Sequence, residues 1–163
     1  LSMGKASKHL LFVPGGSDYL RAWQLAMQAT INWQTKKNDI ALQQTEELLQ
    51  LLRTILGDRH PAVGYIQSDF AWRIFAAGDY ETSEKFLREG LSLARETFGD
   101  QPRTAYILCR LGTQLGRQAD RQDEARELLH EAVEIYTQKL GPDHPRASWA
   151  RREWDKVKPK ASQ

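Results

Sequence analysis

The feature that most constrains the fold of this chain is a turn phrase that returns at a fixed interval. The phrase Leu56-Gly57-Asp58-Arg59-His60-Pro61 is repeated closely as Leu140-Gly141-Pro142-Asp143-His144-Pro145, and a shorter version, Phe98-Gly99-Asp100-Gln101-Pro102, lies between them. Gly57, Gly99 and Gly141 are therefore spaced 42 residues apart. A period of this length indicates one supersecondary unit copied along the chain, which is stable only when it stacks on its neighbours.

The segments between these turns carry apolar residues at helical spacing. Ala41, Leu48, Leu52 and Leu56 recur at intervals of four and seven on one side of a helix, and an earlier series around Trp23 predicts a helix over about 18–35. Glycine and proline at the turns predict where helices end and begin. We therefore predict an all-α fold of three antiparallel helix pairs and a terminal capping helix. The predicted breaks lie near residues 36–38, 57–60, 78–80, 99–102, 118–122 and 141–144.

Three segments are expected along the chain. Residues 1–17 form an N-terminal arm, either flexible or a contact segment, residues 18–158 form the repeat array, and residues 159–163 form a frayed tail. In the arm, Leu11 and Phe12 either lie on a neighbouring apolar surface or make an intermolecular contact. The first residues, Leu1-Ser2-Met3-Gly4, are more typical of a processed or excised segment, so a larger parent protein is one interpretation.

Composition narrows the classes of partner. The 23 basic and 21 acidic residues give a net charge of +2, which creates no global field of the kind that attracts nucleic acid. No apolar run approaches the ~18 residues needed to cross a bilayer, so we expect no membrane association. The single cysteine, Cys109, excludes an internal disulfide and is compatible with a reducing compartment. A cytoplasmic location is therefore expected.

The turn phrase, the entries into the return helices at Tyr80 and Glu124-Ala125, and the period of 42 together resemble the tetratricopeptide repeats of the kinesin light chain type, over about residues 38–158. The resemblance implies a right-handed α-solenoid whose inner helices line a concave groove that binds peptides or proteins. It therefore implies an interaction or scaffold module. The first helices of that family carry two adjacent asparagines, but this chain has Ser68-Asp69 and Cys109-Arg110 in their place.

The resemblance also indicates which side chains face the groove. Alignment of Phe70-Ala71 and Leu111-Gly112 with the large-small pair of the family defines the inner face. The residues then predicted to contact a partner are Tyr65, Ser68, Asp69, Trp72, Tyr106, Cys109, Arg110, Thr113, Arg117, Trp149 and Arg152. Aromatic and arginine side chains concentrate binding energy and hold carboxylates, so the expected partner segment is acidic with an apolar anchor. The alternative is that the aromatic residues only fill space between inner helices.

No arrangement of residues in the sequence predicts catalysis, a cofactor or a metal site. The glycines at 15 and 16 lack the lysine of a phosphate loop, and Cys109 has no histidine on its helix. His60 and His144 precede proline in the repeated turn, so we predict that both are structural. A second class of function remains open, in which the chain forms a homo-dimer or another homo-oligomer, or acts as a regulatory sensor domain, through its end helices 18–35 and 146–158; Trp23, Trp33 and Trp149 are the candidate exposed aromatic residues.

Overall fold

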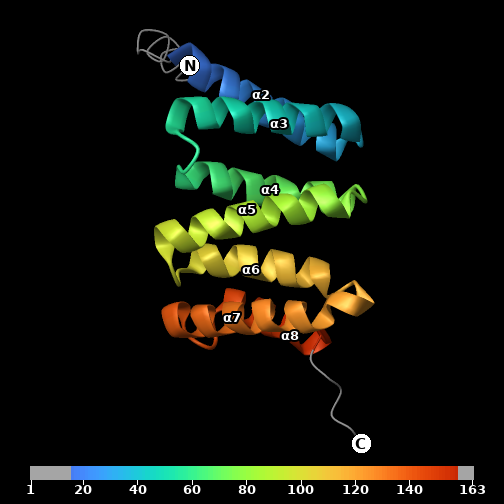
Figure 1. The fold of residues 1–163 in the computed structure, drawn as a ribbon, viewed down its shortest axis with the longest axis vertical. Coiled ribbons are helices and arrows are strands. Elements are labelled where there is room, and N and C mark those ends of the chain that lie inside the picture. The colour runs from blue at the N-terminus through green and yellow to red at the C-terminus, as the bar shows by residue number, and fades with distance from the viewer. Residues whose placement is uncertain (1–15, 158–163) are drawn as a thin grey trace, which may run out of the picture. The chain divides into compact units, whose positions relative to one another are not determined.

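The computed structural model describes residues 16–157, which form seven α-helices joined by short turns and no strands (Figure 1). The helices are α2 Gly16–Gln34, α3 Asn38–Leu56, α4 Pro61–Ala76, α5 Tyr80–Phe98, α6 Pro102–Leu115, α7 Gln122–Leu140 and α8 Pro145–Val157, and a 3-10 turn, η1 Ala119–Arg121, precedes α7. The predicted all-α class and the six predicted breaks are confirmed to within two residues. The tail 159–163 and most of the arm 1–17 lie outside the described residues, but Gly16 and Ser17 belong to α2.

The chain divides into two compact units, residues 1–66 and residues 67–163. The division falls within α4, so unit 1 holds α2, α3 and the first turns of α4, and unit 2 holds the rest of α4 with α5 to α8. None of the described helices is long and apolar enough to cross a membrane.

Unit 1 is built on close packing of α2 against α3. Ala29 and Ala41 are fully buried, and small side chains at such positions let two helices approach closely. Trp33 is buried beside them, where its indole Nε1–H donates a hydrogen bond of 3.1 Å to the hydroxyl of Thr45. The expectation that Trp33 is an exposed aromatic residue is therefore wrong, because its indole has both an apolar site and a polar partner inside the pair.

Four other large apolar residues of α2 lie on the opposite side of the helix. Tyr19, Trp23, Met27 and Ile31 follow one another at intervals of four, and each is between 43% and 64% exposed. The sequence pattern thus identified a helix but not its packing face. The packing face is instead formed by Ala22, Leu25, Ala29 and Trp33, and the small side chains of Ala22 and Ala29 leave room for α3 to approach.

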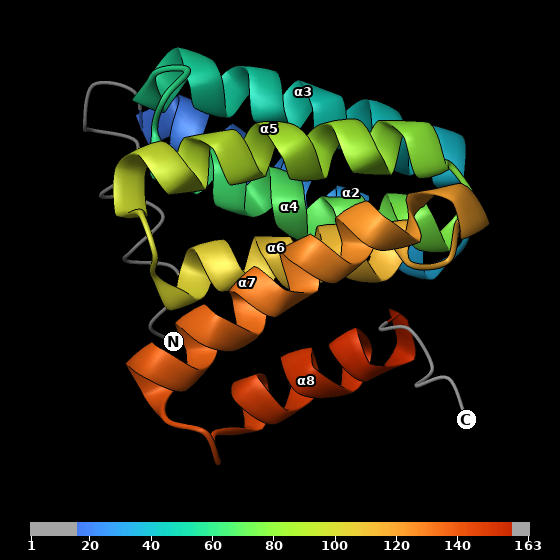
Figure 2. The ribbon, with the colours of Figure 1, turned by 60° about the horizontal axis from the view of Figure 1, so that its bottom comes forward.

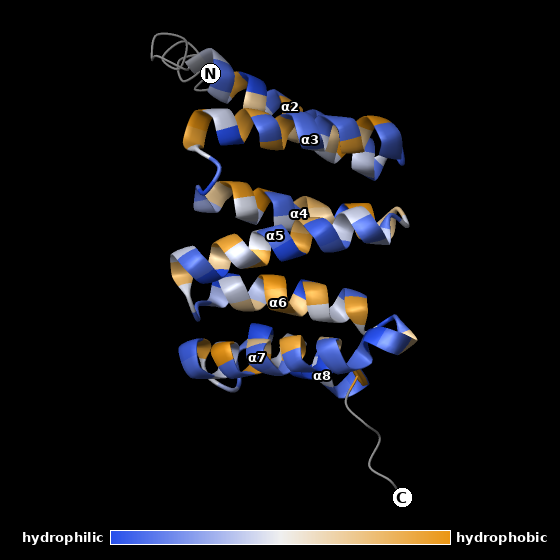
Figure 3. Ribbon diagram, viewed as in Figure 1, coloured by the Kyte–Doolittle hydropathy of each residue, from blue (hydrophilic) through white to orange (hydrophobic). Residues whose placement is uncertain are grey.

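Unit 2 stacks consecutive helices, with α6 packed against α5 and α7, and α7 packed against α8 (Figure 2). Hydrophobic residues gather along α6 (Figure 3), and nine of its 14 residues are buried. Two glycines set the spacing here. A Cβ atom at Gly112 would lie 2.6 Å from Cγ of Leu129, and one at Gly116 would lie 2.5 Å from Cγ1 of Val157. Glycine at these positions therefore permits α7 and α8 to contact α6.

A buried polar network connects three helices of unit 2. The hydroxyl of Ser83 lies 2.7 Å from the carbonyl oxygen of Ala71 and 2.7 Å from Oε1 of Gln114. The side-chain amide of Gln114 donates a bond of 2.8 Å to the carbonyl oxygen of Tyr80. Because each polar atom has a partner, this network can be buried without the cost of an unsatisfied group.

The histidine of the repeated turn accepts the same kind of backbone hydrogen bond in both copies. Nδ1 of His60 accepts a hydrogen bond of 3.2 Å from the amide of Ala62, and Nδ1 of His144 accepts one of 3.1 Å from the amide of Arg146. Both imidazoles thus bind an amide in the first turn of the helix that follows, which would otherwise lack a partner. Gly57 and Gly141 share almost the same backbone, with φ of 93° and 94°, which explains why glycine recurs there.

Candidate functional site

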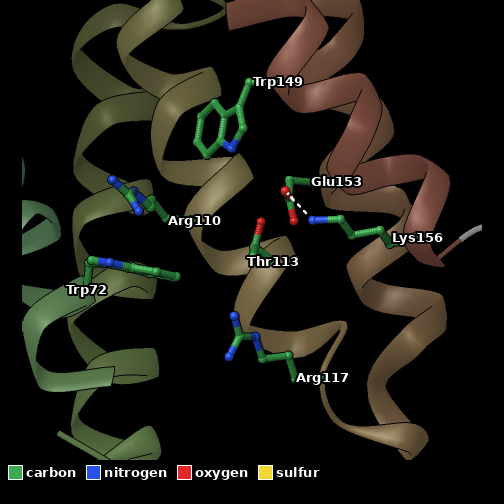
Figure 4. A pocket seen from close by; sticks show the side chains of 7 residues that line it. All are labelled: Trp72, Arg110, Thr113, Arg117, Trp149, Glu153 and Lys156. Carbon is green, nitrogen blue, oxygen red and sulfur yellow. Dashed lines mark hydrogen bonds and ion pairs between the residues drawn. The ribbon is translucent and has the colours of Figure 1, made fainter. Parts of the chain in front are cut away.

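A cavity of about 200 Å³ lies in unit 2 between α4, α6 and α8 (Figure 4). We refer to it as the arginine pocket. Its lining residues are Trp72 from α4, Arg110 and Thr113 from α6, Arg117 from the turn that follows α6, and Trp149, Glu153 and Lys156 from α8.

Helical spacing places these side chains on common faces. Arg110 and Thr113 are three positions apart on α6, and Arg117 follows four positions later, just past the end of the helix; residues 149, 153 and 156 of α8 are four and three positions apart. Residues at these intervals lie one above another on a helix. The pocket is thus formed where two polar and aromatic stripes face each other, with Trp72 adding a wall from α4.

Aromatic rings surround the guanidinium of Arg110. Its Cζ lies 4.6 Å from the ring centroid of Trp72, 5.1 Å from that of Tyr106 and 5.7 Å from that of Trp149. Its Nε–H donates a hydrogen bond of 3.1 Å to the hydroxyl of Tyr106. Cation–π attraction and this bond hold the side chain in place without neutralising its charge.

Arg117 is held in a similar way by a stacked pair of rings. Its Cζ lies 5.0 Å from the ring centroid of Phe75, and Phe75 stacks on Trp72 with centroids 5.1 Å apart. Arg117 is exposed, whereas Arg110 is half-buried. The two guanidinium groups therefore reach the same pocket from two positions, one on α6 and one just past its end, and each rests on an aromatic surface.

The pocket is electropositive because these two arginines lack acidic partners. On the return helices, Arg88 pairs with Glu124 at 2.6 Å and Arg95 with Glu131 at 2.5 Å. No carboxylate of the described residues pairs with Arg110 or Arg117. Lys156 does pair, with Nζ 2.7 Å from Oε1 of Glu153. The lining therefore carries three cations and one carboxylate, a net charge of +2.

A polar atom without a partner completes the pocket. Oγ1 of Thr113 is buried and has no hydrogen-bond partner among the described residues. Figure 4 shows it directed into the space beside Glu153. A buried hydroxyl without a partner is costly, and the cost is removed when a ligand or water supplies one.

The structure brings together five of the residues predicted from the sequence and places a sixth beside them. The five in the lining are Trp72, Arg110, Thr113, Arg117 and Trp149. Tyr106 contacts this group through Arg110 and through Trp149, whose ring centroid is 6.2 Å away. Asp69 is exposed on α4, one turn before Trp72.

The prediction that Ser68 and Cys109 face a partner is wrong, because both side chains are 0% exposed. Successive residues of a helix point about 100° apart. When Asp69 and Arg110 face the surface, the preceding residues must face the neighbouring helices. Burial also raises the pKa of the Cys109 thiol well above its ordinary value, so the thiol stays protonated.

Two further predicted residues do not line the pocket. Arg152 is exposed on α8, and Tyr65 is 48% exposed in unit 1. The residues that sequence reasoning missed are Glu153 and Lys156. Counting from the helix-initial prolines, Pro102 and Pro145, would have found them, because an offset of 43 takes Arg110 to Glu153 and Thr113 to Lys156.

The side chains of the arginine pocket are of the types that bind a ligand through charge and ring contacts. Two guanidinium groups with open hydrogen-bonding edges can hold an anionic group, and the rings of Trp72 and Trp149 can contact an apolar or planar group next to it. Within residues 16–157, no three histidine, cysteine, aspartate or glutamate side chains converge as metal ligands.

Comparison with solved structures relates this fold to known helical repeats. The chain is similar to BtubC from P. vanneervenii, with a TM-score of 0.77 and 18% identity over 94% of this chain. It is also similar to two crystal structures of kinesin light chain repeats from Podosopora anserina, with TM-scores of 0.71 and 0.72, identities of 18% and 20%, and 83% and 84% of this chain covered. The chain spans 61% to 65% of the length of these proteins. At such identities the likeness concerns the fold.

Comparison of sequences gives the family. No curated protein matches the chain significantly. The family model described as tetratricopeptide repeat matches twice in succession, over residues 65–103 and 104–146, which together make up half of the chain. The two matches adjoin each other and together contain Trp72, Arg110, Thr113 and Arg117 of the arginine pocket. The chain belongs to the tetratricopeptide repeat family.

Proposed function

We propose that this chain is a protein-interaction and scaffold module that binds an extended segment of a partner along the outgoing helices of unit 2. The outgoing helix is the first helix of each pair, here α4 and α6, and α8 follows them in the same position. The segment places an acidic side chain against Arg110 and Arg117 and an apolar side chain against Trp72 or Trp149. The observation that carries the proposal is the pair of arginines held over aromatic rings, without carboxylate partners among the described residues, in one cavity. Tetratricopeptide repeats mediate protein–protein interaction generally, which agrees with this proposal.

The two parts of the proposed contact contribute in different ways. Ring contacts and buried area give affinity, because aromatic and arginine side chains in well-packed pockets are the usual binding hot spots. The net charge of +2 accelerates encounter with an acidic segment and is screened by salt. Affinity is therefore expected to fall as salt rises, and a salt-resistant part from the aromatic contacts should remain.

The proposal assigns no catalysis to the described residues and places the module in the cytoplasm. The single cysteine, Cys109, is buried in a protonated form, which suits a reducing compartment without requiring one.

The first experiment identifies the partner and then tests the pocket. Capture from a cell extract with mass spectrometry supplies candidate proteins, and fluorescence titration measures the affinity of their segments. Arg110→Glu should weaken binding at least tenfold, or about 1.4 kcal/mol, with unchanged helicity and melting temperature. Arg151→Glu is the matched control, since Arg151 is exposed on α8 outside the pocket lining. If a variant that combines Arg110→Glu with Arg117→Glu binds the partner with unchanged affinity, the pocket is not the binding site.

A second candidate function is self-association through α2, and the exposed stripe of unit 1 favours it. From residue 22 to residue 35 the sequence contains no charged side chain. Pairing two copies of α2 in antiparallel fashion would set Tyr19 against Ile31 and Trp23 against Met27, each large ring facing a smaller aliphatic chain. Such a face complements itself across a two-fold axis, as a symmetric dimer requires.

Light scattering over a concentration series tests this second candidate. Wild-type protein should pass from monomer to dimer as its concentration rises, and Trp23→Ala should remove the transition. Gln24→Ala is the control, because Gln24 is exposed on the same helix outside the stripe. A mass that stays monomeric at every concentration would exclude self-association through α2.

A further inference from the structure

We propose that the anionic group taken by the arginine pocket is a dianionic phosphoryl group, carried by a phosphoserine or phosphothreonine of the bound segment. This inference rests on the proposed function and makes its acidic side chain more specific. It assigns the recognition of a modified partner to Arg110, Arg117 and Thr113.

The first argument is charge balance. Arg110, Arg117 and Lys156 carry three positive charges, and Glu153 carries one negative charge that is already paired with Lys156. The two arginines therefore contribute +2 without a counter-charge from the described residues. A phosphorylated side chain carries about −1.5 to −2 at neutral pH, whereas a carboxylate carries −1. Of these two groups, only the phosphoryl group neutralises both arginines at once.

The second argument is the number and kind of hydrogen-bond donors. The Nε–H of Arg110 is used by Tyr106, but its terminal nitrogens have no acceptor among the described residues, and neither does the guanidinium of Arg117. Thr113, whose hydroxyl has no partner among the described residues, lies between these two residues in the sequence and lines the same pocket. Two guanidinium edges and a hydroxyl, approaching from three positions, suit the three terminal oxygens of a phosphoryl group, whereas a carboxylate presents two oxygens in one plane.

The third argument is that aromatic rings fix the two arginine side chains before any ligand binds. Stacking of Arg110 on the rings of Trp72 and Trp149 and of Arg117 on Phe75 fixes both side chains without engaging their outer edges. A site that is ordered before binding spends less conformational entropy on the ligand. Planar guanidinium groups in fixed positions are well suited to oxyanions with several acceptor oxygens.

The surroundings favour a peptide over a membrane lipid as the source of the phosphoryl group. Asp69 is exposed on the same side of α4 as Trp72, one turn away, and its carboxylate would oppose an extended anionic lipid surface. The three cations of the lining are also fewer than the cluster of about 4 to 8 lysines and arginines that is typical of lipid recognition. The cavity of about 200 Å³, walled by two indole rings, has room for one phosphorylated side chain with an apolar neighbour.

The test is an NMR titration of the full chain labelled with nitrogen-15, followed through the indole N–H signals of Trp72 and Trp149. Inorganic phosphate is the probe, and acetate at equal ionic strength is the carboxylate reference. Phosphate should shift both signals in a saturable manner and bind at least tenfold more tightly than acetate. Its affinity should fall as the pH is lowered and the dianion takes up a proton, which happens near neutral pH for inorganic phosphate and at about 6 for a phosphorylated side chain.

Variants assign the binding to the pocket. Arg117→Gln should weaken phosphate at least tenfold, and Thr113→Val, which replaces only the hydroxyl with a methyl group, should weaken it several-fold. Arg151→Gln should leave it unchanged. Equal affinity for phosphate and acetate, or phosphate binding that survives both pocket variants, would overturn the proposal.

A second set of experiments distinguishes a phosphopeptide from a membrane lipid as the source of the phosphoryl group. It also distinguishes failure of this inference from failure of the proposed function. A phosphoserine peptide library should be retained by the chain in preference to the same library after phosphatase treatment. Retention by phosphatidylcholine vesicles containing a phosphoinositide, without retention of phosphopeptides, would overturn the peptide assignment. If a captured partner loses affinity with Arg110→Glu but phosphate does not bind, the interaction function stands and the phosphoryl inference fails. Phosphate binding with a partner insensitive to Arg110→Glu would reject the proposed function instead.

Discussion

Arg110 differs from the arginines of the return helices because no carboxylate of the described residues forms an ion pair with it. Arg88 and Arg95 neutralise carboxylates on the neighbouring return helix, whereas Arg110 lies against three aromatic rings that leave its charge intact. A side chain that is fixed but not neutralised is a feature of binding sites, since folding alone would be served as well by an ion pair. This contrast within one chain is the residue-scale reason to look for function on the outgoing helices.

Cys109 provides a prediction at the same scale. Its thiol is fully buried, and burial raises its pKa, so at neutral pH the residue is a protonated thiol rather than a reactive thiolate. We expect Ellman's reagent to leave native protein unmodified at about pH 8 and to titrate one thiol per chain in guanidinium chloride. Rapid reaction of the native chain would show that α6 opens readily and exposes this position.

At the scale of elements, the docking of α8 depends on the space left by Gly116. The side chain of Val157 lies where a Cβ of residue 116 would stand, and Nε of Arg126 donates a bond of 3.1 Å to the carbonyl oxygen of Val157. The last turn of α8 is thus fixed by one apolar and one polar contact. Because α8 carries Trp149, Glu153 and Lys156, its docking also completes the arginine pocket.

We therefore expect Gly116→Val to destabilise the chain by about 1 to 3 kcal/mol, the usual cost of overpacking, and to weaken ligand binding in the pocket. Thermal unfolding followed by circular dichroism measures the first effect, and the indole signal of Trp149 reports the second. Ala119→Val is the control, since Ala119 is exposed in the neighbouring 3-10 turn. Equal melting temperatures for the two variants would contradict this account of α8.

A charged network links the return helices α5 and α7. Arg88 lies 2.7 Å from Glu84 and 2.6 Å from Glu124, and Arg121 lies 3.1 Å and 2.7 Å from the same two carboxylates. Partial burial works against ionisation of Glu124, but hydrogen bonds from Arg121 and Arg88 outweigh it and lower its pKa.

The direction of this pKa shift fixes its effect on stability. A carboxyl with a folded-state pKa below its unfolded value stabilises the fold at higher pH, and this contribution is lost as pH falls through the folded pKa. Glu124→Gln should therefore flatten the decline of melting temperature in acid and lower the melting temperature at neutral pH. Glu127→Gln, an exposed change on the same helix, should keep the wild-type profile. Parallel profiles for wild type and Glu124→Gln would show that the network does not contribute.

The elements were predictable because turn chemistry is local. Glycine with positive φ and proline in the first turn mark helix boundaries regardless of tertiary packing, and the turns at Gly57 and Gly141 follow this rule. The packing face of α2 was not predictable in the same way, because apolar residues lie on both of its sides. Only the small residues Ala22 and Ala29 indicate where a neighbouring helix can approach.

Only part of the pocket was predicted from the sequence, because the repeat period does not fix the register of every helix. The period of 42 holds for the return helices, but the turn after Gly99 lacks one residue, so the outgoing helices keep a different register. This difference explains why Arg152 was chosen and its neighbour Glu153 was missed. The burial of Ser68 and Cys109 likewise depends on helix rotation by a single residue, which an alignment by period alone does not resolve.

At the scale of the whole molecule, the chain consists of two compact units, each with buried residues of its own. Leu48 is 1% exposed in unit 1, and Leu129 is fully buried in unit 2. In repeat proteins each element depends mainly on its sequence neighbours, and stability is nearly a sum of local terms. A cavity in one unit should therefore weaken that unit first, although both belong to one chain.

Leu48→Ala tests this expectation, and Leu129→Ala is its counterpart. Each removes a buried leucine, at a cost of about 2 to 5 kcal/mol, so the two variants differ chiefly in where the cavity lies. Hydrogen exchange followed by mass spectrometry should show faster exchange over α3, Asn38–Leu56, in Leu48→Ala and over α7, Gln122–Leu140, in Leu129→Ala. Gln50→Ala, an exposed change on α3, should alter neither segment. If both leucine variants accelerate exchange equally in both helices, the chain unfolds as one cooperative body. If the effects stay separate, a partner bound at the arginine pocket should protect α6 and α8 and leave α3 unprotected, because ligand binding stabilises the unit that holds the site.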